Sequence, residues 1–340
     1  LGVKEVPIDY LIPNKKYFFF SHTIKKQPHN QKLLQAIIEK KIDLYDHETI
    51  VDANHKRLIG FGRYAGIVGA YNALRAFGIK YELFNVPKAE TLASKEALIT
   101  KLKKQILPPV KIVLTGKGGK VANGALEILE GIKIKKVTPE NFLSKKYTEP
   151  VFTQLDVLDY NTRADGKQVD KNDFYSNPEH YISNFGRFTK VADIYIAGHF
   201  YGNGAPVILT QEMLAAKDCM IKVIADISCD VNGPIAANIR CSTIADPFYG
   251  YLPSAHQEAD MFHPAAIVVM AVDNLPCELP KDATEGFGEM FMEHVIPAFF
   301  DGDKNGILAR AKITENGKLT PRFDYLTVYV TTTNEANATL

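Results

Sequence analysis

Two residues near the start of the chain, Lys4 and His22, are of types that exchange protons with a substrate. Lys4 stands beside Glu5, and His22 follows the aromatic run 17–20. A histidine titrates near neutral pH, and a lysine does so when burial or a neighbouring cation lowers its pKa. Such a pair suits a reaction in which protons move on and off nitrogen or oxygen. Taken singly, Lys4 is more simply explained as part of a surface ion pair, and His22 as a structural histidine. Whether the two residues form a functional pair depends on the elements that surround them.

A glycine-rich segment suggests a second kind of chemistry, the binding of a phosphate. The apolar run 111–115 leads into Gly116, Gly118 and Gly119, and small residues at helical spacing follow. In a turn from strand to helix, glycines let backbone N–H groups approach a phosphate, and the helix N-terminus favours negative charge. A strict G-x-G-x-x-G pattern needs glycine where Val121 stands, so this segment alone also fits an ordinary tight turn.

Strands alternate with helices along the chain, which predicts a doubly wound parallel sheet. The expected strands are 17–20, 42–45, 111–115, 132–137, 191–197, 222–227 and 265–272, and the expected helices are 30–40, 61–77, 89–105, 120–130, 209–216 and 285–300. The polar segment 144–186 is predicted to be an insertion or long loop. Thr115, His199, Ser228 and Asp273 follow the carboxyl ends of four strands, where such sheets bind ligands.

Composition excludes several function classes. The 340 residues carry a formal net charge of +1, which gives no reason to expect a nucleic-acid or membrane-surface partner. The apolar run 265–272 is too short to span a bilayer. The four cysteines lack metal-ligand spacing and are interpreted as free thiols in a reducing compartment, so we expect no metal and a cytoplasmic location. They are Cys219, Cys229, Cys241 and Cys277.

Four short motifs occur in an order typical of one family. They are GVKEVP at 2–7, FFFSHT at 18–23, FGRYAG at 61–66 and VDNLP at 272–276. The set resembles the saccharopine dehydrogenases of the lysine-forming type, and above all the lysine–2-oxoglutarate reductase half of the bifunctional lysine-degrading enzyme. Alanine dehydrogenase and the soluble part of proton-translocating transhydrogenase are more distant kin. The resemblance covers about residues 1–300.

The resemblance implies an α/β fold of two Rossmann-like domains with doubly wound parallel sheets. The dinucleotide domain, 63–282, would be inserted in a substrate domain made of 1–62 and 283–330, with a tail at 331–340. Family members supply a further substrate-binding arginine from a strand before the K-E-x-P motif, and this sequence begins too late to contain it. We therefore expect an N-terminally incomplete substrate domain, or a real loss of that segment.

The resemblance also implies roles for particular residues. Lys4 and His22 would be the catalytic acid–base pair. Substrate would be bound by Gln27, Arg57, Phe61, Ser228, Cys229 and Asp230. The cofactor, NAD or NADP, would contact Lys56, Gly119, Lys120, Phe200, Ile227, Val272, Asp273, Asn274 and Leu275. Thr138 stands where NAD-preferring folds place an acid, with Glu140 as a substitute, whereas Lys120 and Lys136 would tolerate a 2′-phosphate.

The implied reaction interconverts saccharopine with L-lysine and 2-oxoglutarate by hydride transfer to or from an imine. Its carbinolamine and imine steps move protons, which suits Lys4 and His22, and the carboxylates of saccharopine suit Arg57 with Gln27. Two alternatives remain at this point. One is an alanine dehydrogenase or another opine-type amino-acid dehydrogenase. The other is a catalytically silent dinucleotide-binding paralogue.

Overall fold

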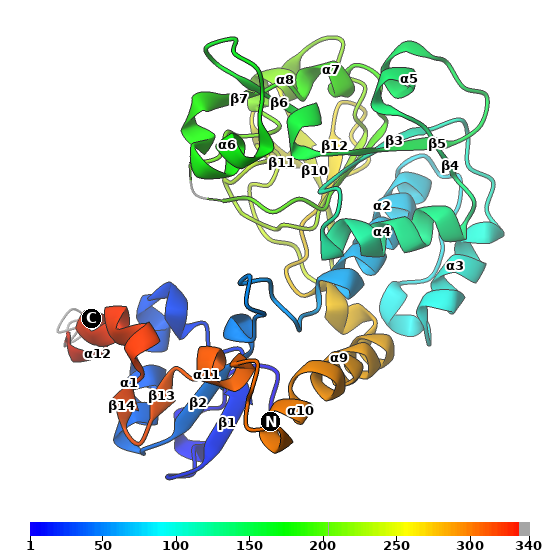
Figure 1. Cartoon of the computed structure of the whole chain (residues 1–340). Coiled ribbons are helices and arrows are strands. Elements are labelled where there is room, and N and C mark those ends of the chain that lie inside the picture. The colour runs from blue at the N-terminus through cyan, green and yellow to red at the C-terminus, as the bar shows by residue number, and fades with distance from the viewer. Residues whose placement is uncertain (203, 333–340) are drawn as a thin grey trace, which may run out of the picture. The chain divides into compact units, whose positions relative to one another are not determined.

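The chain divides into two units that are not consecutive in sequence. The computed structural model describes residues 1–202 and 204–332 (Figure 1). The first unit combines Leu1–Gly60 with Glu285–Leu340, and the second unit is Phe61–Thr284. The second unit is therefore inserted into the first along the chain.

An eight-stranded sheet forms the centre of the second unit, as far as the structure describes it, in the order β11-β10-β12-β9-β8-β3-β5-β4. The six strands from β12 to β4 are parallel, whereas β10 and β11 add an antiparallel edge that the sequence analysis missed. The strands are β3 Lys111–Thr115, β4 Lys135–Lys136, β5 Val151–Leu155, β8 Ile194–Ala197, β9 Val223–Asp226, β10 Phe248–Leu252, β11 Gln257–Ala259 and β12 Ile267–Met270. The predicted α/β fold with a large parallel sheet is confirmed.

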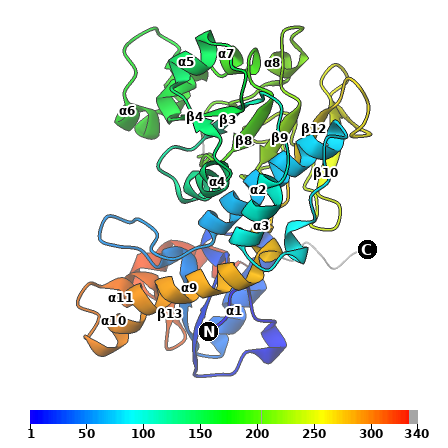
Figure 2. The ribbon, with the colours of Figure 1, turned by 90° about the vertical axis from the view of Figure 1, so that its right-hand side faces the viewer.

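Helices cover both faces of this sheet (Figures 1 and 2). Successive strand residues point to opposite faces, so Ile112 and Leu114 pack with the α2 and α4 side, and Val113 packs with the other side. The helices of the unit are α2 Gly62–Lys80, α3 Lys95–Lys103, α4 Lys120–Gly131, α5 Pro139–Ser144, α6 Lys171–Ser176, α7 Gly186–Thr189 and α8 Gln211–Ala215. Burial on both faces explains why β8 and β12 are continuous apolar runs.

The segment 144–186 is folded, so its prediction as a long loop was wrong. It contains β5, which pairs directly with β3 and lies between β3 and the edge strand β4. Thr153 and Gln154 are buried polar residues of β5, and they hid the strand in the sequence. The segment also contains a two-stranded antiparallel sheet formed by β6 Asn161–Arg163 and β7 Tyr181–Ser183.

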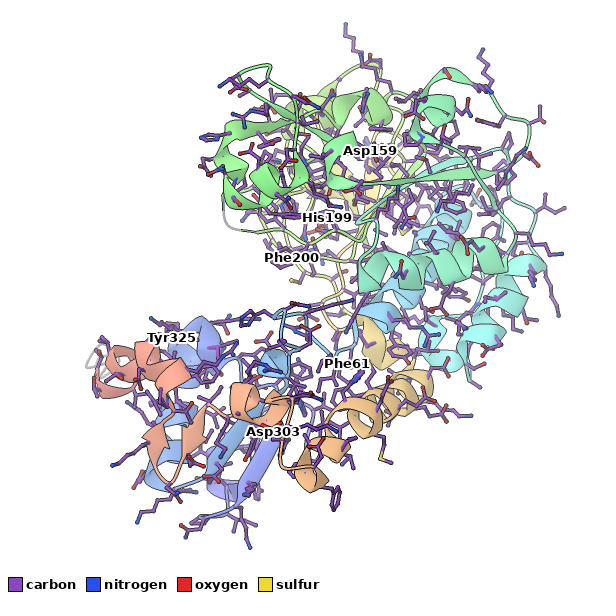
Figure 3. The ribbon with its side chains drawn as sticks, in the orientation of Figure 1. Phe61, Asp159, His199, Phe200, Asp303 and Tyr325 are labelled. Carbon is purple, nitrogen blue, oxygen red and sulfur yellow. The ribbon has the colours of Figure 1, made fainter. Side chains whose placement is uncertain are left out.

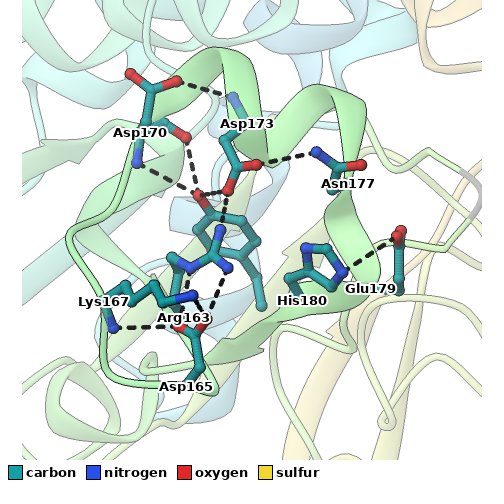
Figure 4. A network of polar contacts seen from close by, with 9 residues as sticks. Arg163, Asp165, Lys167, Asp170, Asp173, Asn177, Glu179 and His180 are labelled. Carbon is teal, nitrogen blue, oxygen red and sulfur yellow. Dashed lines mark hydrogen bonds and ion pairs between the residues drawn. The ribbon is translucent and has the colours of Figure 1, made fainter.

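A polar network fastens α6 to this small sheet (Figure 4). Arg163 forms a two-pronged ion pair with Asp165 at 2.8 and 2.9 Å and also contacts Asp173. Asp173 additionally accepts from the hydroxyl of Tyr181 at 2.8 Å. Asp170 caps the first turn of α6 by accepting from the Asp173 N–H. The network fixes α6, whose residues contribute to the pocket described below.

The first unit contains a smaller parallel pair, β1 Lys16–Phe19 beside β2 Asp43–Asp46. Helix α1, Gln31–Glu39, buries Leu33, Leu34 and Ile37 in its core. The predicted helix 285–300 is divided into two, and the break falls at Val295, before Pro297. Helix α9, Pro280–His294, begins in the second unit and continues into the first. The remaining elements of the first unit are α10 Ile296–Phe300, α11 Ile307–Ala311, β13 Thr314–Glu315, β14 Lys318–Leu319 and α12 Thr327–Thr331. Most of the predicted tail, residues 333–340, lies outside the described residues.

Candidate active site

The turn between β3 and α4 needs glycine at its first position. Gly116 has φ +93°, and a Cβ there would lie 2.1 Å from the carbonyl oxygen of Gly198. The backbone that follows β3 therefore passes directly against the backbone that follows β8. Gly119 is the N-cap of α4, and the first turn of that helix contains no acidic residue. This arrangement offers backbone N–H groups and a helix N-terminus to an anion.

A close approach between α2 and α4 replaces the missing third glycine. A Cβ on Gly66 would lie 1.8 Å from the carbonyl oxygen of Val121, and one on Gly124 would lie 1.9 Å from that of Arg63. The third glycine of a dinucleotide fingerprint serves close packing of the helix. Here Gly66 and Gly124 provide that packing, so Val121 is tolerated at the fingerprint position.

A pocket of about 550 Å³ opens beside this turn. Of the predicted cofactor residues, Gly119, Lys120 and Phe200 line it. The other lining residues come chiefly from the glycine turn and from the folded segment after β5, and include Asp156, Tyr160, Asn161, Lys171, Phe174 and Tyr175. A pocket with apolar and aromatic walls and a few polar groups is typical of a small-molecule or cofactor site.

His199 contributes a buried polar group to the pocket wall. It follows β8, beside Phe200 (Figure 3), and its Nδ1 lies 2.9 Å from the Thr115 hydroxyl and 3.5 Å from that of Tyr195. Its Nε2 is buried and has no hydrogen-bond partner among the described residues. Burial lowers the pKa of His199 to about 4, so the imidazole is neutral at pH 7. If Nδ1 accepts from a hydroxyl, Nε2 carries a proton that it can donate.

The sheet puts Asp156, not Thr138, after the strand beside β3. β4 follows α4 in the chain but forms the edge of the sheet, and β5 is the neighbour of β3. Thr138 caps α5 by accepting from the Asn141 N–H, and it is not one of the residues lining the pocket. Asp156 directly follows β5, lines the pocket and forms an ion pair with Lys171 at 2.8 Å. The sequence analysis missed it because it missed β5.

The motif 226–230 forms a tight turn after β9. The buried carboxylate of Asp226 accepts from the N–H and the hydroxyl of Ser228, at 3.1 and 2.6 Å, and from the Cys229 N–H at 3.3 Å. Asn238 donates to its other oxygen at 2.7 Å. Burial raises the pKa of Asp226. Asp226 thus shapes the turn that carries the predicted substrate residues Ser228, Cys229 and Asp230.

Three predicted cofactor residues have side chains in the hydrophobic core. They are Ile227, Val272 and Leu275. Their side chains are at most 9% exposed, so a ligand could meet these residues chiefly through their backbone. Asp273 and Asn274, between them in sequence, are exposed at the end of β12.

In the first unit, the backbone places Lys4 and His22 on adjacent segments. Gly2 donates to Phe18 at 2.8 Å, and Phe20 donates to Val3 at 3.0 Å, so the chain start runs beside β1. The next contact along this pair of segments joins the carboxylate of Glu5 to Nδ1 of His22. Burial alone would raise the pKa of Glu5, but the hydrogen bond with His22 and the charges of His22 and Lys4 hold it below its usual value.

Arg57, predicted to bind substrate carboxylates, already has an acidic partner. Glu48 lies 3.2 Å from the Arg57 guanidinium and 3.3 Å from the Lys25 ammonium. The Glu48 side chain is 8% exposed, whereas that of Arg57 is 48% exposed. Gln27 precedes the short helix Pro28–Asn30 and accepts from the Asn30 side chain. Glu5 and Glu48 contact predicted site residues, and the sequence analysis assigned neither of them a role.

The predicted residues are therefore distributed over both units. Lys4, His22, Gln27, Lys56 and Arg57 belong to the first unit, and all the others to the second, where Phe61 is the N-cap of α2. In residues 1–202 and 204–332, no cluster of three or more His, Cys, Asp or Glu side chains could hold a metal ion. In the same residues, every helix is too short or too polar to cross a membrane.

Sequence comparison finds relatives along almost the whole chain. The chain is 29% identical over 369 residues to alpha-aminoadipic semialdehyde synthase of Arabidopsis thaliana. The aligned region covers 96% of this chain and 34% of that protein. The mitochondrial protein of the same name from Rattus norvegicus is 28% identical over 378 residues, covering 96% and 40%. These proteins are homologues of the chain. The chain spans between a third and two fifths of their length.

A second group of relatives matches more weakly. Saccharopine dehydrogenase [NAD(+), L-lysine-forming] of Yarrowia lipolytica is 22% identical over 308 residues, covering 87% of this chain and 73% of that protein. The resemblance inferred from the four motifs is confirmed by these two groups. No family model matches the chain.

Solved structures show the same fold at low identity. L-alanine dehydrogenase superposes with a TM-score of 0.59 at 14% identity, over 97% of this chain and 80% of the other. Transhydrogenase from Sinorhizobium meliloti superposes with a TM-score of 0.55 at 13% identity, over 94% and 80%. These likenesses establish the fold alone.

Proposed function

We propose that the protein is an NAD(P)-dependent saccharopine dehydrogenase of the lysine-forming type, that is, a lysine–2-oxoglutarate reductase. The observation that carries the proposal is the contact of Glu5 with His22 directly beside Lys4. This contact lies in a chain whose homologues are alpha-aminoadipic semialdehyde synthases and saccharopine dehydrogenases. The substrates would be L-lysine, 2-oxoglutarate and saccharopine.

We assign the dinucleotide to the second unit and the proton chemistry to the first, with the domains 63–282 and 1–62 plus 283–330. The residues present fit a dinucleotide, because the glycine turn, the N-terminus of α4 and the pocket of about 550 Å³ adjoin one another. Gly119 and Lys120 would hold the diphosphate. The other proposed cofactor contacts are Lys56, Phe200, Ile227, Val272, Asp273, Asn274 and Leu275. When bound, the nicotinamide supplies or accepts the hydride.

Lys4 and His22 would move the protons of the reaction. Forming an imine from the lysine ε-amine and the ketone of 2-oxoglutarate removes protons from nitrogen and adds protons to the departing oxygen. With Nδ1 of His22 directed to Glu5, its Nε2 is left to exchange a proton with the substrate. Lys4, next to Glu5 in sequence, would act as the second group of the pair.

Arg57 and Gln27 would hold substrate carboxylates, since a guanidinium pairs with a carboxylate through two hydrogen bonds. Glu48 already contacts Arg57, so substrate would compete with Glu48 or share the guanidinium with it. Phe61, Ser228, Cys229 and Asp230 of the second unit are the remaining proposed substrate residues.

We propose NAD as the preferred cofactor on the strength of Asp156. In dinucleotide folds, an acid at the end of the strand beside the glycine turn binds the ribose hydroxyls of NAD. Asp156 follows β5, the neighbour of β3, and lines the pocket. Asp156 would repel the 2′-phosphate of NADP. The ammonium of Lys171, which is paired with Asp156, would reduce that repulsion.

A cytoplasmic location is proposed from the cysteines. All four are free thiols, as expected in a reducing compartment. The partners would be small molecules only.

The test is lysine-dependent oxidation of NADH by the full chain in the presence of 2-oxoglutarate. Lys4→Met should lower this rate by about 10²-fold or more, because one proton-transfer group is lost, and NADH binding should be unchanged. Lys15→Met, an exposed lysine of the same unit, is the matched control and should keep the rate. If the unmutated chain binds NADH but lacks this activity, the function is wrong. Activity with pyruvate and ammonia instead would identify an alanine dehydrogenase.

A further inference from the structure

Two cysteine thiols touch at the carboxyl end of β12. The Sγ atoms of Cys229 and Cys241 lie 3.5 Å apart, close to the contact distance of two sulfur atoms. Cys229 is partly buried in the turn after β9, and Cys241 is exposed at the surface. Residues 230–240 therefore form a loop whose two ends lie close together.

Each cysteine is held in position by hydrogen bonds to its surroundings. Cys229 has φ +54°, which the Asp226 carboxylate supports by accepting from its N–H. Its thiol donates to the carbonyl oxygen of Ala271 at 2.9 Å. Ser242, the neighbour of Cys241, donates from its N–H to the same carbonyl at 2.8 Å and accepts from the Ala271 N–H at 3.0 Å. The backbone of Ala271, directly after β12, thus forms hydrogen bonds with both of the segments that carry these cysteines.

We propose that Cys229 and Cys241 form a redox-active dithiol, which a peroxide-class oxidant converts into a disulfide. A disulfide needs the sulfurs at about 2.05 Å, so they must approach by only about 1.5 Å. The pairing does not depend on the enzymatic function proposed above.

The exposed thiol would react first. Cys241 in its thiolate form attacks one peroxide oxygen, which gives a sulfenic acid and releases hydroxide. The Cys229 sulfur then attacks the Cys241 sulfur, and the sulfenic oxygen leaves as water with the Cys229 proton. In total, two thiols lose two protons and two electrons, and one hydrogen peroxide becomes two water molecules. Burial raises the pKa of the Cys229 thiol, so the exposed Cys241 is the thiol that meets the oxidant first.

The cross-link would alter the end of β12. It removes the thiol donor from the Ala271 carbonyl, immediately before residues 272–275. On the proposed function, those residues contact the dinucleotide, so we expect the oxidised protein to bind NADH about tenfold more weakly, as small displacements in a site can cost that much. This second part rests on the proposed function, and the first part does not.

Peptide mapping of the full chain after hydrogen peroxide treatment tests the pairing. Trypsin cleaves after Arg240 and so separates Cys229, in peptide 223–240, from Cys241, in peptide 241–281. Cys277 shares the second peptide, and therefore the mapping uses Cys277→Ser. We expect the two peptides to be joined, with a loss of about 2 Da, and to be released by dithiothreitol. Cys241→Ser should abolish the link, and Cys219→Ser should keep it.

Two outcomes would overturn the proposal. One is a Cys241 oxidised to sulfinic acid while Cys229 stays a free thiol. The other is a disulfide that joins two chains instead of peptides of one chain. NADH binding by reduced and oxidised protein then tests the consequence, and equal affinities would refute it. If even the reduced protein fails to bind NADH, the proposed function fails, and the mapping result is unaffected.

Discussion

The carboxylate of Asp156 and the ammonium of Lys171 lie 2.8 Å apart in the pocket wall, one after β5 and the other at the start of α6. This pair leads to the first prediction. Asp156→Asn should weaken NADH binding about tenfold, because the acceptor for the ribose hydroxyls loses its charge. NADPH binding should weaken less or improve, since the repulsion of a 2′-phosphate is lost. Titration of both cofactors by fluorescence measures the ratio of the two affinities.

Lys171→Ala is the complementary variant. It removes the cation beside Asp156, so the NADPH affinity should fall more than the NADH affinity. If both variants change the two affinities equally, the pair is structural and does not select the cofactor.

The second prediction concerns Gly116. Gly116→Ala places a Cβ 2.1 Å from the Gly198 carbonyl oxygen at φ +93°, and it should abolish NADH binding and lower the free energy of unfolding by about 3 kcal/mol. Gly118→Ala is the matched control, because its φ is +85° but no atom lies within 4 Å of the added Cβ. It should cost only about 1 kcal/mol. Denaturant unfolding and NADH titration compare the two; equal losses would contradict the importance of the contact with Gly198.

The third prediction concerns Glu5, the partner of His22. Glu5→Gln keeps the shape but removes the charge that orients and supports the imidazolium, so kcat should fall about tenfold or more. NADH binding should be unchanged, because Glu5 is not one of the proposed cofactor contacts. Steady-state kinetics and a separate binding titration measure the two effects. A variant with normal kcat would assign Glu5 a purely structural role.

The fourth prediction concerns a buried acid in the second unit. Glu278 is 2% exposed and accepts from the Asn72 side chain at 3.0 Å. Burial raises its pKa from 4.5 to about 7. In the unfolded chain Glu278 loses its proton near pH 4.5, whereas the folded protein keeps it until about pH 7. Between these values the unfolded state binds fewer protons, so Glu278 destabilises the fold progressively as the pH rises.

Glu278→Gln should therefore become more stable relative to the unmutated chain as the pH rises from about 4.5 to 7. The gain should level off above pH 7 at about 2–3 kcal/mol. Urea unfolding at about pH 4.5, 6 and 8 measures it, with Glu289→Gln, at an exposed glutamate of α9, as the control. A gain that is the same at every pH would contradict the burial of an ionisable Glu278.

The sequence predicted most of the parallel sheet but not its order. Apolar runs such as 111–115 and 265–272 were recognisable because both faces of those strands are buried. β5 was not recognisable, because Thr153 and Gln154 are polar yet buried between β3 and β4. Missing β5 moved the expected acid to Thr138, after the edge strand. Which strand lies beside β3 depends on pairings between segments that are distant in sequence. Local sequence patterns do not predict such pairings.

The candidate site was only partly predictable for the same reason. Gly119, Lys120 and Phe200, which the family resemblance implied as cofactor contacts, line the pocket. Glu5, Glu48 and the Cys229–Cys241 pair become evident only when segments far apart in sequence meet. Their residue types gave no signal, because isolated acids and cysteines are usually solvent-exposed or structural.

The first unit is built from two segments that are separated in sequence by the second unit, so the ribosome synthesises them at different times. Ile313 donates from its N–H to the carbonyl of Leu44 at 2.7 Å, and Thr314 donates to that of Ile42 at 2.7 Å. The core of this unit also includes Phe323 and Leu326. The N-terminal segment thus cannot complete its core until residues 313–326 have been synthesised, whereas residues 61–284 can fold beforehand. Until then a nascent chain would carry β1 and α1 with exposed apolar faces, and chaperone protection would matter most in that interval.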